Sequence, residues 1–190
     1  EIVTDASTSV IALVRKLKAK YPNEFGNLFH ALDIWHKSVK LTKKLAKAAK
    51  IKGCEAIGEW VEPIRNHFWY IAQECNGCKD KLKDSWFGVL HHVAGEHEWA
   101  DGQCIHGPLV ATEENKTILE KNSKAMEALR KVILDPRFLN SLHHYVTFRH
   151  TSKIENFNSM LLKYATKQIG FQNESFMARA LLAAIDHNSH

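Results

Sequence analysis

The sequence predicts a fold that is α/β over its first fifty residues and mostly α-helical after them. Two short apolar runs, at 2–5 and 27–32, flank a stretch with helical spacing of apolar residues, which is the pattern of a strand–helix–strand unit. After Gly53 the strand-like runs stop, and apolar residues recur at helical spacing to the end of the chain. No run of about 18 apolar residues is present, so we expect no membrane-spanning helix.

The opening unit begins with Ile2-Val3-Thr4-Asp5, a β-branched run that predicts a strand. Ser7 and its neighbours Thr8 and Ser9 offer an N-cap for the following helix, which Tyr21-Pro22-Asn23 should end. The second run, at 27–32, is mostly apolar and is expected to be a buried strand. Because a helix connects the two strands, we expect them to pair in parallel.

The rest of the chain is expected to be helical. A lysine-rich helix should follow Trp35, and residues 95–110 should be irregular because they contain three glycines and a proline. Pro63 is expected to kink or interrupt the helix that contains it. The further helices are predicted at 55–74, 79–94, 113–134, 137–146, 152–166 and 173–187.

Two strands do not make a stable sheet beside so many helices, so we expect further strands upstream of Glu1. The chain would then be a fragment of a longer polypeptide. Its first residues are acidic and lack the apolar segment of a secretory signal peptide.

Three acidic residues occupy positions where they can serve chemistry. Asp5 and Asp33 follow the two predicted strands, and in open α/β sheets sites form at the carboxyl ends of strands. Glu155 lies in the first turns of a late helix. Each acid also has a structural explanation, as a helix cap or as a favourable charge at a helix N-terminus. Together they indicate a site for divalent metal ions that act on a phosphodiester.

The combination of motifs resembles a known family. Asp5 after a β-branched strand is followed by a helix, Tyr21-Pro22, a second strand and the run Asp33-Ile34-Trp35-His36. The segment Thr151-Ser152-Lys153-Ile154-Glu155-Asn156-Phe157-Asn158 then precedes a basic helix. This order resembles DDE-type transposases with a ribonuclease H-like fold, and it is most similar to transposon-derived proteins of a Kolobok-like type. The resemblance spans essentially the whole chain.

The resemblance implies a partial ribonuclease H-like domain with a helical insertion. Residues 1–52 would form the first part of the core, 53–135 the insertion with a Cys/His cluster, and 136–190 the C-terminal helices. Asp5 resembles the second catalytic acid and Glu155 the third, whereas Asp33 and His36 match an accessory Asp-x-x-His motif. The first acid would lie upstream of Glu1, so the chain alone is expected to be inactive.

The activity implied is DNA strand cleavage and transfer with two Mg²⁺ or Mn²⁺ ions, in a nuclear protein whose partner is DNA. One alternative is a catalytically dead, domesticated DNA-binding protein derived from a transposon. Another is a zinc-stabilised helical interaction module. The sequence leaves the presence of a homo-oligomer open.

The distribution of charge is consistent with an anionic partner. The net charge is +5, and residues 35–52 contain seven lysines and no acid. The candidate DNA contacts are four of these lysines, which lie at helical spacing, and an arginine shortly before Glu155. They are Lys37, Lys40, Lys44, Lys47 and Arg149. The alternative is a solvated outer face of an amphipathic helix.

A second candidate site lies in a window rich in cysteine and histidine, at 67–106. Cys75-x-x-Cys78 is one half of a familiar zinc site, and Cys104-x-His106 can supply the other half. The predicted ligands of a structural Zn²⁺ are Cys75, His97, Cys104 and His106, with Cys78 or His92 as substitutes. The alternative is a set of surface histidines and inert buried thiols.

Overall fold

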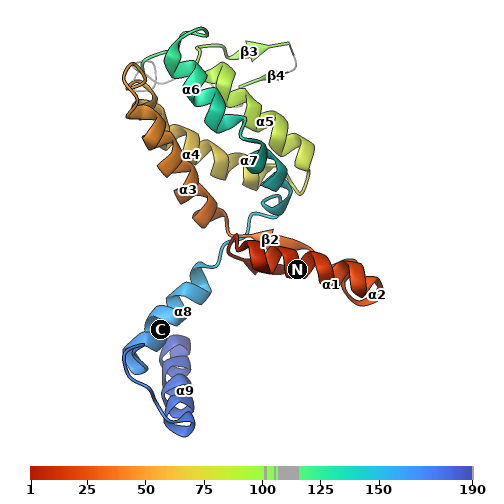
Figure 1. Ribbon diagram of the computed structural model, residues 1–190, viewed down its shortest axis with the longest axis vertical. Helices are drawn as coiled ribbons and strands as arrows, with labels where there is room; N and C mark the ends of the chain where they lie inside the picture. Colours follow the sequence, from red (N-terminus) through yellow and green to blue (C-terminus); the bar gives the residue numbers. More distant parts are fainter. Residues whose placement is uncertain (101, 105, 107–115, 190) are drawn as a thin grey trace. The chain divides into compact units, whose positions relative to one another are not determined.

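A computed structural model describes residues 1–100, 102–104, 106 and 116–189 of the chain (Figure 1). These residues form two compact units, 1–150 and 151–190, and each is described by itself. The described chain is mostly helical, with a few short strands.

The first unit opens with the predicted strand–helix–strand motif. Its elements are β1 (Ile2–Thr4), α1 (Thr8–Lys20), the short α2 (Pro22–Phe25) and β2 (His30–Leu32). The two strands pair in parallel, with Ile2 opposite His30 and Thr4 opposite Leu32, which confirms the predicted pairing. β2 is fully buried, as its apolar sequence predicts. Both strands end immediately before an aspartate.

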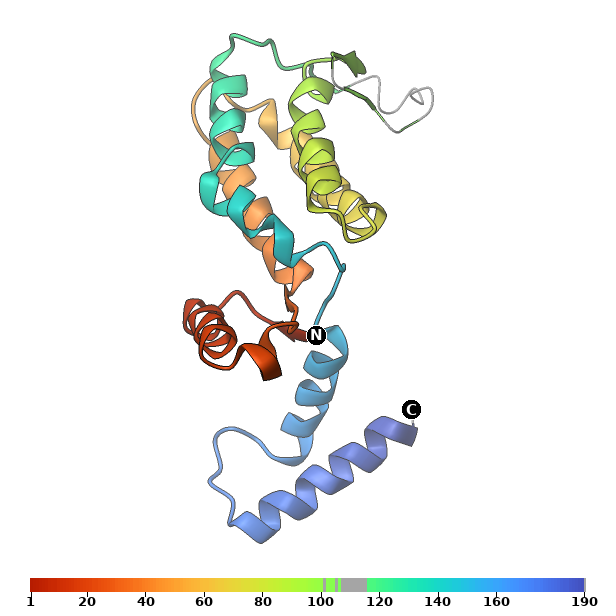
Figure 2. The same cartoon turned by 90° about the vertical axis from the view of Figure 1, so that its right-hand side faces the viewer.

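Four helices form the main body of the first unit: α3 (Ile34–Ala49), α4 (Ile57–Glu74), α5 (Lys79–His92) and α6 (Lys124–Ile133). α3 packs against α4 and α6, and α5 packs against the same two helices, as both views of the ribbon show (Figures 1 and 2). α7 (Pro136–Ser141) and the 3₁₀ turn η1 (Leu142–His144) lead back toward β2. Pro63 lies inside α4 and does not end it.

Aromatic side chains form the centre of this core. Phe68 is fully buried, and its ring contacts those of Trp86, Phe138 and Tyr145 at centroid distances of 5.4 to 5.7 Å. The Trp86 indole Nε1 donates a 2.9 Å hydrogen bond to the carbonyl of Ile133, so its polar atom is satisfied. One continuous core includes residues from β2 through η1, and it crosses the boundary at 52/53 suggested by the sequence.

The chain between α5 and α6 differs from expectation. The long helix predicted at 113–134 begins only at Lys124, because Ser123 forms its N-cap and accepts a 3.1 Å hydrogen bond from the Met126 amide. Residues 113–115 of that prediction lie outside the described residues. Within the segment expected to be irregular, β3 (Glu98–Trp99) and β4 (Gly102–Gln103) pair as a small antiparallel hairpin.

The second unit is a pair of packed helices, α8 (Ser152–Tyr164) and α9 (Asn173–Ser189). Both were predicted, with ends within two residues. The Arg179 guanidinium donates a 2.8 Å hydrogen bond to the carbonyl of Tyr164 and ties the two helices together. Over the described residues the strands form two separate pairs, β1–β2 and β3–β4, so the fold is α-dominated.

Candidate metal centres

The ends of β1 and β2 bring two aspartates and a histidine together. Asp5 and Asp33 follow Thr4 and Leu32, which are paired in the parallel ladder, and the Asp33 amide donates a 3.0 Å hydrogen bond to the carbonyl of Thr4. His36 Nδ1 lies 3.5 Å from Asp5 Oδ1 and 3.4 Å from Asp33 Oδ1. The structure thus brings together three of the side chains that the sequence selects, all within the first unit.

The two carboxylates of this acidic edge differ in their surroundings. The Asp5 side chain is 62% exposed, whereas that of Asp33 is 2% exposed. Asp33 is also the N-cap of α3, and its Oδ1 accepts a 2.9 Å hydrogen bond from the His36 amide. Burial raises the pKa of the nearby Tyr145 hydroxyl, and the negative charge of Asp33 adds to that increase. The structural and functional interpretations of Asp33 are thus compatible.

Glu155 belongs to the second unit. It lies in the first turn of α8, as predicted, and the Thr151 hydroxyl donates a 3.4 Å hydrogen bond to its Oε1. Within the first unit, the acidic edge consists of Asp5, Asp33 and His36. The catalytic role of Glu155 stays a prediction.

The predicted DNA contacts on α3 fall into two groups. Lys37 points into the protein, where its Nζ donates a 2.7 Å hydrogen bond to Ser141 Oγ and lies 4.5 Å from the Phe138 ring centroid. Lys44 forms an ion pair with Asp135. Lys40 and Lys47 are exposed. Lys44 is exposed as well, so three of the four predicted lysines are displayed and Lys37 is not.

The exposed face of α3 is set by the residues that it buries. Leu41, Leu45 and Ala48 face the core, so the opposite side of the helix carries the exposed lysines. These are Lys40, Lys43, Lys44, Lys47 and Lys50. The apolar positions alone would have selected this stripe from the sequence. The Arg149 guanidinium, the remaining predicted contact, pairs with Glu1 at 2.9 Å.

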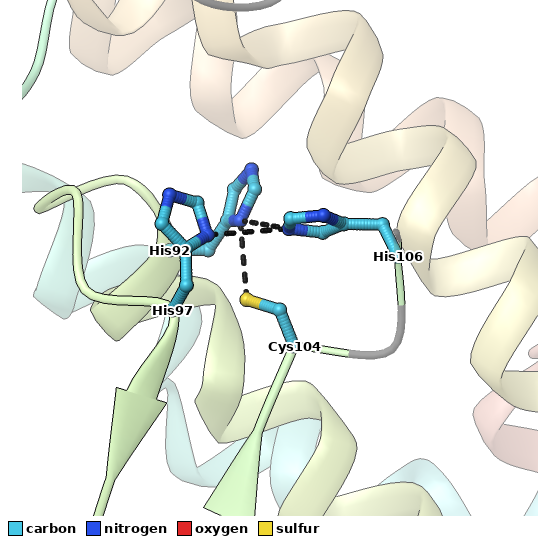
Figure 3. A group of neighbouring side chains, drawn as sticks. All are labelled: His92, His97, Cys104 and His106. Carbon is cyan, nitrogen blue, oxygen red and sulfur yellow. Dashed lines mark hydrogen bonds between the residues drawn. The ribbon is translucent and has the colours of Figure 1, made fainter. Parts of the chain in front are cut away.

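A second centre combines three histidines and a cysteine. The side chains of His92, His97, Cys104 and His106 converge, with their ligand atoms all within 4.8 Å of one another (Figure 3). His92 ends α5, His97 precedes β3, Cys104 follows β4, and His106 lies two residues after Cys104. Each can offer a nitrogen or sulfur atom to one ion, so the group can hold a metal ion such as zinc.

The observed group differs from the predicted ligand set by one residue. Cys75 is buried, and its thiol lies within hydrogen-bond distance of the carbonyls of Ala72 and Val146, at 3.3 and 3.4 Å. It caps the C-terminal end of α4 in the core, where it packs as a small apolar side chain. Cys78 is exposed at the start of α5. His92, which the sequence offered as a substitute, joins His97, Cys104 and His106 instead.

Comparisons of the chain with protein-family models, with curated proteins and with solved structures find no match. Within the described part of the chain, no helix is both long and apolar enough to cross a membrane.

Proposed function

We propose that the chain carries part of the catalytic centre of a polynucleotidyl transferase, which cleaves and joins DNA strands as DDE-type transposases with a ribonuclease H-like fold do. The observation that carries the proposal is the acidic edge, where two parallel strands present Asp5 and Asp33 side by side with His36 between their carboxylates. The parallel pairing with a crossover helix is also the local topology of a ribonuclease H-like sheet.

Carboxylates grouped at a strand edge suit hard divalent cations, which prefer oxygen ligands. Mg²⁺ or Mn²⁺ held there would activate the attacking water or hydroxyl and stabilise the departing oxygen. Asp5 would be the exposed ligand. Asp33 would be the buried one, with its carboxylate held by a hydrogen bond from the His36 amide of α3. His36 would orient both carboxylates, and the family resemblance would make Glu155 of α8 the third catalytic acid.

A specific observation favours a second function. The cluster of His92, His97, Cys104 and His106 supports a zinc-stabilised helical interaction module, in which a structural Zn²⁺ takes part in no reaction. The two functions are compatible within one chain because the two centres use different residues.

The first experiment measures Mn²⁺ binding to the chain by electron paramagnetic resonance, comparing wild type with Asp5→Asn, Asp33→Asn and Glu155→Gln. We expect each substitution to weaken binding about tenfold or more, because each removes one anionic ligand. The matched control is Glu174→Gln, since Glu174 lies in the first turn of α9 as Glu155 lies in that of α8. Equal Mn²⁺ affinity in all five proteins would refute the proposal.

The second experiment tests activity. A longer polypeptide that includes the expected upstream acid should nick a supercoiled plasmid in Mg²⁺ or Mn²⁺, and Asp5→Asn or Glu155→Gln should abolish the nicking. A folded polypeptide that binds DNA and does not nick it would favour the domesticated DNA-binding protein instead.

A further inference from the structure

The four side chains of the His/Cys cluster are already spaced as ligands of a tetrahedral ion. His106 Nε2 lies 3.2 Å from His97 Nδ1 and 3.3 Å from His92 Nδ1, and His92 Nδ1 lies 3.3 Å from Cys104 Sγ (Figure 3). With Zn–N bonds of about 2.0–2.1 Å, two nitrogens of a tetrahedral site lie about 3.3–3.4 Å apart, and a nitrogen and a sulfur lie about 3.6 Å apart. These three separations are close to the edges of such a site, and the four ligand atoms all lie within 4.8 Å of one another.

The protein itself supplies all four positions of such a site. Structural zinc sites have four protein ligands, whereas catalytic ones keep one position for water or substrate. Burial raises the pKa of the Cys104 thiol, but a bound zinc ion deprotonates a coordinating thiol outright. The cluster therefore matches a closed, structural site.

The segment around the cluster buries little hydrophobic surface. Among the described residues from Ala94 to Ile118, none is buried, so hydrophobic burial contributes little to their order. The hairpin packs on α5 through a half-buried side chain: the Trp99 ring stacks on His91 at 4.8 Å, and it lies so close to Gly88 of α5 that a Cβ there would be 3.1 Å from it.

The two ends of this segment are fastened to α4 and α5. At one end the His92 ring packs edge-on against Trp60 of α4, with centroids 5.6 Å apart. At the other end the Leu119 amide donates a 2.8 Å hydrogen bond to the carbonyl of Val93, and Leu119 is buried. Between these points, the cluster brings together His92 at the end of α5, His97 and Cys104 on the two sides of the hairpin, and His106.

We propose that His92 Nδ1, His97 Nδ1, Cys104 Sγ and His106 Nε2 bind one structural Zn²⁺, and that this ion holds the β3–β4 hairpin and His106 against the end of α5. Because an unfolded segment has no preformed site, the free energy of binding is gained as the segment orders. This inference is independent of the acidic edge and stands whether or not the chain processes DNA.

The test replaces zinc with Co²⁺ and records the absorption spectrum of the chain. We expect one Co²⁺ at this cluster, with the intense visible bands of a tetrahedral ion and a thiolate-to-Co²⁺ charge-transfer band in the near ultraviolet. Cys104→Ser should abolish the charge-transfer band, and Cys78→Ser, which changes an exposed thiol, should keep it. Ions at the acidic edge cannot produce this band because that edge has no thiol.

A second variant guards against loss of folding. His106 is exposed, so His106→Gln leaves the core intact, and it should weaken Zn²⁺ binding at least about tenfold. The exposed His143 serves as the matched control in His143→Gln. Unchanged affinity in His106→Gln, or a charge-transfer band that survives Cys104→Ser, would overturn the assignment of ligands.

Hydrogen exchange tests the ordering role. Removal of zinc with a chelator should expose the amides of Cys104 and Leu119, which bond to the carbonyls of His97 and Val93. The amides in the middle of α4 should stay protected. If all of these amides keep their protection in the metal-free chain, the ion does not order the segment.

Discussion

The indole Nε1 of Trp60 donates a 2.9 Å hydrogen bond to the carbonyl of Thr117, fifty-seven residues away. The same Trp60 ring packs on His92, so one side chain of α4 contacts both ends of the segment that contains the His/Cys cluster. Glu59, the preceding residue, accepts hydrogen bonds from the amide and the hydroxyl of Thr117 at 2.7 and 3.0 Å. Contacts with α4 thus hold both ends of this segment.

Trp60→Phe should destabilise the protein by about 1 kcal/mol, because it removes the hydrogen bond to Thr117 and keeps most of the ring packing. It should also weaken metal binding at the His/Cys cluster, since the segment would be held less well. Urea unfolding and zinc titration check the two effects. The control is Trp69→Phe, whose ring packs on Phe148 elsewhere on α4. Similar losses of zinc affinity in both variants would contradict the role given to Trp60.

The structural and proposed catalytic roles of Asp33 can be separated by substitution. Asp33→Ala removes the N-cap of α3 and should cost about 1 kcal/mol, whereas Asp33→Asn keeps a capping oxygen and should cost much less. Both should weaken Mn²⁺ binding at the acidic edge. Thermal unfolding and Mn²⁺ titration of the two variants provide the measurement. If Asp33→Asn is as unstable as Asp33→Ala, the capping bond is not the source of the loss.

The parts of the fold that could be predicted are those determined by local sequence. β1 and β2 follow from β-branched and apolar runs, and their parallel pairing follows from the helix between them. The predicted helix starts before α6 because helical periodicity alone continues upstream, whereas the cap at Ser123 sets the observed start. The β3–β4 hairpin was missed because its strands are too short to show alternation.

The candidate sites show where local pattern is insufficient. Cys75-x-x-Cys78 suggested a ligand pair, but the packing of α4 buries Cys75 in the core and leaves Cys78 exposed. His92 joins the cluster because α5 ends beside the hairpin, which is a tertiary relationship. Lys37 likewise has the sequence spacing of a surface lysine, but its Nζ lies over the Phe138 ring and donates a hydrogen bond to Ser141. Such outcomes depend on contacts distant in sequence.

Lys37 should make stability depend on pH. Burial, with a contribution from Lys44, lowers the pKa of Lys37 in the folded protein to about 8, below its ordinary value of 10.5. Between these values the unfolded chain binds more protons, so stability rises with pH as the penalty of a buried charge is relieved. Lys37→Met should lack this rise. Urea unfolding of both proteins at pH 7 and pH 10 measures it, and parallel changes in the two would exclude a buried charge at Lys37.

Phe68 should be among the most costly core positions to truncate. Its fully buried ring contacts Trp86 of α5, Phe138 of α7, and Tyr145, which directly follows η1. Phe68→Ala should lower the free energy of unfolding by about 3–5 kcal/mol, because it removes a buried ring and leaves a cavity between elements that cannot all close around it. Tyr70→Ala on the same helix is the control, since Tyr70 is exposed and its loss should cost less than about 1 kcal/mol. Denaturant unfolding measures both, and a loss at Phe68 no larger than at Tyr70 would show that these aromatic contacts do not hold the helices together.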